Sequence, residues 1–103
     1  MDRITKILKD IHIPFAYHHF AEGESPKPPF ICYLTTGSDN FSADGVVYHK
    51  QNVYHLELYT DIKDPETENR VEKVLDENEI YYEKQETYIE SEKLYEVVYI
   101  FES

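Results

Sequence analysis

Near the start of the chain, apolar residues recur every three or four positions, which predicts an amphipathic helix over residues 2–12. Its apolar stripe consists of Ile4, Ile7, Leu8 and Ile11. Pro14 ends this helix, because a proline pushes the residue before it toward extended geometry. We expect the stripe to pack against the rest of the domain.

A second helix is predicted to begin at Asp64, Pro65 and Glu66. An aspartate accepts hydrogen bonds from the free amides of a first turn, a proline suits the first helical position, and a glutamate suits the positive end of the helix dipole. The buried stripe of this helix consists of Val71, Val74 and Leu75. Packing of that stripe on a sheet is expected to hold the helix in place.

The clearest strand follows Asn52, where apolar and polar side chains alternate with a period of two. One face of this strand carries Tyr54, Leu56 and Leu58. The other face carries Val53, His55, Glu57 and Tyr59. A single apolar face is typical of a half-solvated antiparallel strand, and the charge of Glu57 indicates that its face points outward or toward another subunit.

Other strands are predicted over residues 15–20 and 30–36, and two more between residues 80 and 101, separated by acidic residues near 90–92. The last strand is expected to lie centrally, because one face is apolar and the other mixed. Residues 21–29 and 37–45 are expected to form loops, and Phe41 in the second loop is either an anchor on the core or a partner contact. Over residues 48–54 the pattern allows a hairpin around 50–52 or a bulged continuous strand.

These elements predict a single α+β domain over residues 1–103, with two helices packed on a mostly antiparallel sheet in the order α-β-β-β(β)-α-β-β. A chain of 103 residues can bury one core of ordinary size. The sequence shows no internal repeat and no second zone of different composition.

The formal net charge is −11, from 21 acidic and 10 basic residues, and the acidic surplus extends through most of the chain. Direct nucleic-acid binding is not expected, because non-specific affinity depends on Lys and Arg that neutralise phosphates. The one concentration of basic residues, Arg3, Lys6 and Lys9, is expected to be the solvated face of the first helix. No signal peptide and no apolar run of ~20 residues is visible, so a soluble protein without a membrane segment is expected.

Histidine and cysteine, which often bind metals or act in catalysis, are present, but not at the spacings of known metal or catalytic motifs. The five histidines are His12, His18, His19, His49 and His55. They lack the patterns of zinc sites: a turn is predicted between His49 and His55, and His18 and His19 are expected to point to opposite sides of a strand. The single cysteine, Cys32, suits a buried core position. No nucleophile or phosphate-binding motif occurs, so no catalytic residue, metal or cofactor is predicted.

The order of several short segments is more specific than any single motif. It runs from the leading helix through PPFICY at 28–33, NFSAD at 40–44 and YHLELYT at 54–60, to ETYIE at 86–90. In this order the chain resembles small tail-completion, or tail terminator, proteins of long-tailed phages and prophages of Gram-positive bacteria. Gly45 departs from the family pattern, in which that position is often Asn.

The resemblance implies a non-enzymatic subunit that self-associates into a ring, commonly a hexamer, at the head-proximal end of the tail tube. Its implied partners are further copies of itself, the tail tube protein and a head-completion or connector protein. It also implies a location in the virion tail, after assembly in the cytoplasm of the bacterial host.

Six residues are the predicted subunit or partner contacts. They are Phe41, Asp44, Val53, His55, Glu57 and Tyr59. Two alternative functions stay open: a head-tail connector or other neck component, and an acidic protein-interaction module such as a DNA mimic that occupies a nucleic-acid-binding enzyme.

Overall fold

The computed structural model describes residues 3–43 and 46–103, and of residues 37–43 and 46–51 it describes the backbone only. Its elements are α1 (Arg3–Ile11), β1 (Phe15–Tyr17), β2 (Phe30–Ala43), β3 (Val46–Thr60), α2 (Pro65–Glu77), β4 (Tyr82–Ile89) and β5 (Leu94–Glu102). The strands form one sheet in the order β1-β2-β3-β5-β4, in which only the β1–β2 pair is parallel. The predicted α+β class and element order are confirmed, and β5 lies centrally as expected.

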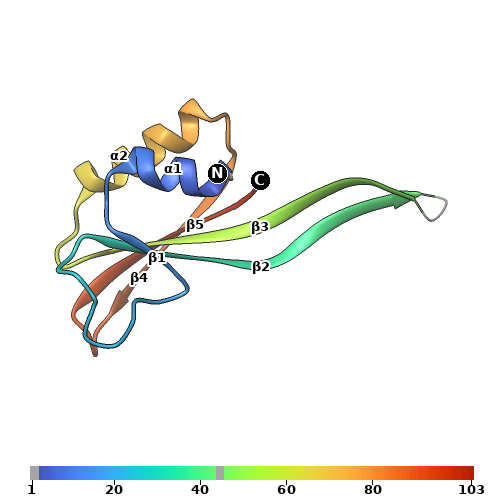
Figure 1. Cartoon of the computed structure of the whole chain (residues 1–103). Helices are drawn as coiled ribbons and strands as arrows, with labels where there is room; N and C mark the ends of the chain where they lie inside the picture. The colour runs from blue at the N-terminus through green and yellow to red at the C-terminus, as the bar shows by residue number, and fades with distance from the viewer. Residues whose placement is uncertain (1–2, 44–45) are drawn as a thin grey trace.

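Both helices lie on one face of the sheet, and the hydrophobic core lies between them and that face (Figure 1). The fully or nearly fully buried core residues are Ile4, Ile7, Leu8, Ile11, Ile13, Ile31, Leu56, Leu58, Val71, Leu75, Ile80, Val97, Tyr99 and Phe101. Both predicted helical stripes therefore face the core, with Val74 partly buried at its edge. At about 1.5 to 3 kcal/mol for each fully buried aliphatic side chain, this packing outweighs the weak propensity of a helix as short as α1.

The start of α2 is set by Asp64, as predicted. Its carboxylate accepts hydrogen bonds from the Thr67 hydroxyl at 2.7 Å and from the Thr67 backbone N–H at 3.1 Å, and these bonds lower the pKa of Asp64. One turn further on, the guanidinium of Arg70 donates to the carbonyls of Ile11 at 3.0 Å and His12 at 3.1 Å. These bonds join α2 to the C-terminal end of α1.

The alternation predicted after Asn52 is confirmed. Leu56 and Leu58 are fully buried, and Tyr54 packs against the core. The side chains of the intervening positions are half-buried on the opposite face: Val53, His55, Glu57 and Tyr59.

The largest departure from the predicted elements is a two-stranded arm, formed by the distal parts of β2 and β3, that leaves the body of the sheet (Figure 1). Backbone pairing continues from Gly37↔Val53 to Ala43↔Val46. The turn and loop expected over residues 37–43 are therefore wrong, and β3 is the continuous strand, not a hairpin around residues 50–52. Cross-strand hydrogen bonds satisfy a backbone whose local sequence favours turns, so pairing between the two strands overrides the turn preference.

The first strand is shorter than expected, because β1 ends at Tyr17. His18 has a φ of 65°, a left-handed conformation that interrupts an extended strand. The expectation that His18 and His19 point to opposite sides is wrong: their Nδ1 atoms lie 2.9 Å apart and their rings meet edge to face. The backbone N–H of His18 donates to the carbonyl of Tyr33 at 2.7 Å, which holds this bend against β2.

Candidate functional site: the open face of the sheet

The face of the sheet that points away from α1 and α2, here called the open face, carries most of the predicted contact residues. Its half-buried residues on the three central strands are Phe30, Leu34, Val53, His55, Glu57, Tyr59, Glu96, Val98 and Ile100. Strand register places them in rows, with His55 between Leu34 and Ile100, and Tyr59 between Phe30 and Glu96. Among the residues that the structure describes, no helix covers this face.

Four of the six predicted contact residues thus lie together along one side of β3. The other two lie elsewhere: Phe41 is in the arm, where the structure describes its backbone, paired with that of His49, and Asp44 lies outside the described residues. The finding that His49 and His55 share one strand corrects the expected turn between them. The contact roles of all six residues remain predictions.

Toward one end of the open face, one tyrosine hydroxyl bridges two carboxyl groups. The hydroxyl oxygen of Tyr59 lies 3.0 Å from Oε1 of Glu57 and 2.7 Å from Oε2 of Glu96. A hydroxyl carries a single hydrogen, so it can donate to only one of these carboxyls at a time. The second carboxyl completes a hydrogen bond to the tyrosine only when it carries a proton itself.

This arrangement shifts the titration of both partners on β3. Burial raises the pKa of Glu57, and the nearby charge of Glu96 adds to the shift, while the hydrogen bond from Tyr59 opposes it. Burial also raises the pKa of Tyr59, together with its bond to Glu96, so the phenol stays protonated. A protonated phenol beside two carboxyls suits a structural contact better than a reacting group.

A second carboxylate cluster, which the sequence reasoning missed, lies on the helix side of the sheet between α2 and β4. Glu68 is only 3% exposed, and its carboxylate accepts from the ammonium groups of Lys63 at 2.7 Å and Lys84 at 2.9 Å. Lys84 also reaches Glu72 at 2.8 Å, and the Tyr99 hydroxyl donates to Glu72 at 2.7 Å. Lys63 in turn forms an ion pair with Glu86 of β4.

The position of Glu68 carried a signal that helical spacing could have revealed. Glu68 lies three and seven positions before Val71 and Leu75, on the same helix face as the apolar stripe. Burial by itself would raise the pKa of Glu68, but the hydrogen bonds from Lys63 and Lys84 outweigh it and lower the pKa. This cluster therefore contains its own counter-charges.

One end of the open face is covered by the loop that follows β1. The rings of Phe20 and Phe30 meet edge to face, with their centroids 5.6 Å apart. The ring of Phe30 stacks on that of Tyr59, with a centroid distance of 5.1 Å. Cys32 is buried beneath this loop, as predicted for a small apolar residue, but it points to the open face and not into the helix-side core. Burial, then the charges of Glu57 and Glu96, raise the pKa of the Cys32 thiol, which disfavours the reactive thiolate.

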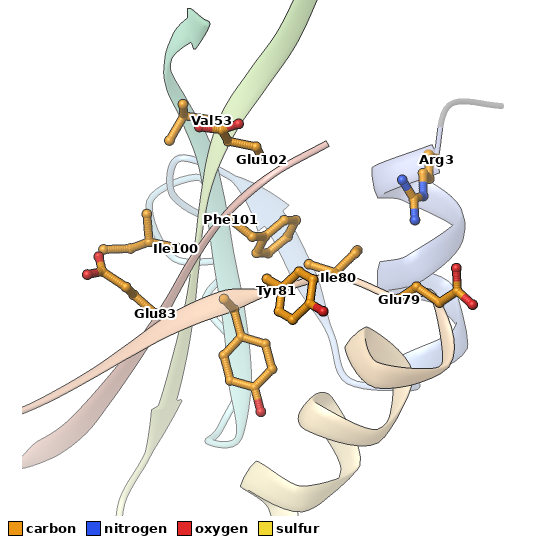
Figure 2. Close-up of a pocket in the computed structure, with 10 residues that line it drawn as sticks. Arg3, Val53, Glu79, Ile80, Tyr81, Glu83, Ile100, Phe101 and Glu102 are labelled. Carbon is orange, nitrogen blue, oxygen red and sulfur yellow. The ribbon is translucent and has the colours of Figure 1, made fainter.

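The other end of the open face meets a shallow hollow beside the root of the arm. Figure 2 shows Val53, Ile100 and Glu83 on the side away from α1, and Ile80 and Phe101 on the side of α1. Glu83 pairs with Ile100, and Glu102 pairs with Val53, so both glutamates add carboxylates to the open face. The guanidinium of Arg3 at this hollow is already engaged, with the carbonyl of Asn78 at 2.6 Å and the hydroxyl of Ser103 at 3.2 Å.

Within the described residues, no three His, Cys, Asp or Glu side chains are grouped so that they could hold a metal ion. Neither described helix is long and apolar enough to cross a membrane. No protein-family model matches the sequence, and no curated protein matches it.

Proposed function

We propose that the chain is a non-enzymatic structural subunit of a phage tail, which self-associates into a ring, commonly a hexamer, and caps the head-proximal end of the tail tube. The observation that carries the proposal is the arm of β2 and β3. Along β3, pairing with the C-terminal strand stops at Asn52 and Ser103, and along β2, pairing with β1 covers only Ile31 to Tyr33. The described backbone of the arm is therefore paired only within the arm.

Such an arm is poorly suited to a chain that acts alone. A two-stranded ribbon is marginally stable by itself in water, and its outer edges offer unpaired backbone donors and acceptors to another chain. The described core lies in the body of the domain, between the two helices and the sheet. A long arm with exposed edges favours a role in assembly.

Two further features support the tail role. The open face leaves four predicted contact residues half-buried on a surface without a helix, as a subunit interface would. The order of sequence segments resembles that of tail-completion proteins, in which such subunits contact the tail tube protein on one side and a head-completion or connector protein on the other.

The purified protein can test this proposal directly. We expect a mass in solution that corresponds to a closed ring, ring-shaped particles in electron micrographs, and decoration of one end of isolated tail tubes. A protein that stays monomeric, binds no tube end and leaves tail length unchanged when its gene is deleted would contradict the proposal. Binding at the head in place of the tube would favour the head-tail connector instead.

An arm-shortened variant isolates the part played by the arm. Residues 37–51 are replaced by a two-residue Asn-Gly turn, which suits a tight hairpin between Thr36 and Asn52. We expect the variant to keep its far-UV circular dichroism and cooperative unfolding but to lose ring formation. The control variant carries Glu22→Gly and Glu24→Ser in the loop after β1, and it is expected to assemble normally. Ring formation by the arm-shortened chain would show that the arm is not the assembly contact.

A further inference from the structure

We infer that the open face receives the basic side of α1 from a second copy of this chain. The inference rests on the self-association in the proposed function, and it names the two surfaces that meet. The arm is a separate contact, since the surfaces named here lie on the body of the domain.

The open face carries carboxylates at both ends and, between them, apolar side chains of β5 beside His55 of β3. Glu57 and Glu96 lie at one end, Glu83 and Glu102 at the other, and Val98 and Ile100 lie between them on β5. Among the side chains that the structure describes, no Lys or Arg lies on this face, and none forms an ion pair with these glutamates.

The carboxylate cluster on the helix side of the sheet contains lysines that pair with its glutamates. There, two lysines lie among three glutamates: Lys84 contacts Glu68 and Glu72, and Lys63 contacts Glu68 and Glu86. Half-buried carboxylates without a lysine or arginine partner are costly, because burial removes their hydration. On the open face the Tyr59 hydroxyl and the charges of His18 and His55 replace only part of it for Glu57. The open face therefore lacks, within one chain, the cations that the helix-side cluster contains.

The complementary surface is the solvent side of α1. Lys6 and Lys9 are exposed on it, three positions apart, and neither makes an ion pair or side-chain hydrogen bond within the described part of the chain. Lys63 and Lys84 are engaged in the helix-side cluster, and Arg70 is engaged with the carbonyls of α1. With a net charge of −11, two copies repel each other unless these lysines meet carboxylates.

The two surfaces cannot meet within one chain. α1 lies on one face of the sheet and the open face is the other (Figure 1). The contact is therefore head to tail, and repetition of a head-to-tail contact closes into a ring when the rotation allows it. In this contact the aliphatic stems of Lys6 and Lys9 lie on Val98 and Ile100, while their ammonium groups reach the carboxylates.

Charge reversal in two separate variants tests the contact. The helix variant carries Lys6→Glu and Lys9→Glu, and the face variant carries Glu83→Lys and Glu102→Lys; all four residues are exposed, so both chains are expected to fold. Sedimentation velocity at low salt is expected to show that each variant alone assembles about tenfold or more weakly than the wild type. An equimolar mixture is expected to restore assembly, because every contact between the two variants again joins opposite charges.

A control variant with Lys73→Glu, at an exposed residue of α2, also adds negative charge but away from the open face and the loop that covers its end. It is expected to assemble within about twofold of the wild type, since it changes only weak, screened charge repulsion. Reversal variants that assemble like the wild type, or a mixture that fails to recover, would overturn this contact and leave the proposed ring intact. A wild-type chain that stays monomeric at every concentration would overturn both.

Discussion

Both faces of the sheet carry glutamates that are at least half-buried, but the surroundings of these carboxyl groups shift their pKa values in opposite directions. On the helix side, Glu68 is nearly buried between two lysines, and its pKa is lowered. On the open face, Glu57 shares the hydroxyl of Tyr59 with Glu96, and burial raises its pKa. Burial thus acts against the charge of both glutamates, and only on the helix side do lysines reverse its effect on the pKa.

Within the described side chains, one chain supplies lysine partners for the buried glutamate on the helix side, but none for the glutamates of the open face. A buried charge is stable when partners replace its hydration, and the helix-side cluster supplies those partners from α2, β4 and the preceding turn. Of the described residues, the open face supplies no lysine to Glu57, only the Tyr59 hydroxyl and the charges of His18 and His55. Departures of this kind from local consistency are expected where a protein makes contacts outside itself.

The largest contrast is expected from truncating apolar side chains on the two faces. Leu58→Ala leaves a cavity between sheet and helices, and it is expected to lower the free energy of unfolding by about 3 kcal/mol. Val98→Ala, on the half-buried open face, is expected to cost about 1 kcal/mol. Urea unfolding at one low protein concentration measures both, because assembly would add a concentration-dependent term. Equal losses would contradict the distinction between a covered and an open face.

Removing one glutamate charge on each face is expected to have different effects on the free energy of unfolding. Glu68→Gln removes the charge that holds Lys63 and Lys84, and we expect a loss of about 2 kcal/mol in the free energy of unfolding at neutral pH. Glu57→Gln keeps a hydrogen-bonding group beside Tyr59 and removes the repulsion with Glu96, so stability is expected to stay level or rise by about 0.5 kcal/mol. Parallel urea titrations of the two variants decide the point, and a loss of 2 kcal/mol in both would refute the contrast.

The pH dependence of stability is expected to show the same opposition. Glu57 has a raised pKa in the folded state, so its contribution is complete below the unfolded pKa and is lost as pH rises through the folded value. Glu68 has a lowered pKa, so its contribution is present above the unfolded pKa and is lost as pH falls through the folded value. Each group adds a slope of at most about 1.4 kcal/mol per pH unit.

The two glutamine variants show which part of the pH dependence of stability comes from Glu57 and which part from Glu68. Glu57→Gln is expected to remove part of the loss on raising pH, and Glu68→Gln part of the loss on acidification, when urea midpoints are measured between about pH 3 and pH 8. The variants are needed because the charges of His18 and His55 also act on Glu57. If each variant flattened the opposite limb of the curve, the assignments of the two faces would be reversed.

The smallest effect is expected where the loop after β1 covers one end of the open face. Phe20→Ala removes the edge-to-face contact with Phe30, a contact of about 0.5 to 1.5 kcal/mol, so local opening above Cys32 should increase by at most about tenfold. The rate of Cys32 modification by a thiol reagent measures this opening, with Tyr81→Ala at an exposed site as the control. No acceleration in the Phe20 variant would indicate that the loop does not protect the thiol.

Much of the fold follows from periodicity in the chain itself. The stripes of both helices, the Asp64 cap and the alternation of residues 53–59 were predicted, because burial on one side of a regular element leaves a repeat in the residues that form it. The same alternation assigned Val53, His55, Glu57 and Tyr59 to one face, which the structure confirms as the open face.

Only the tertiary structure decided the features that depend on pairing and contact between separate segments of the chain. The arm exists because residues 37–43 pair with residues 46–53, and the bridge from Tyr59 to Glu96 exists because β3 pairs with β5 in one register. The Lys63–Glu68–Lys84 contacts likewise join segments that no local repeat connects. Pairing between segments depends on register and approach in space, and these leave no period in the sequence of either partner.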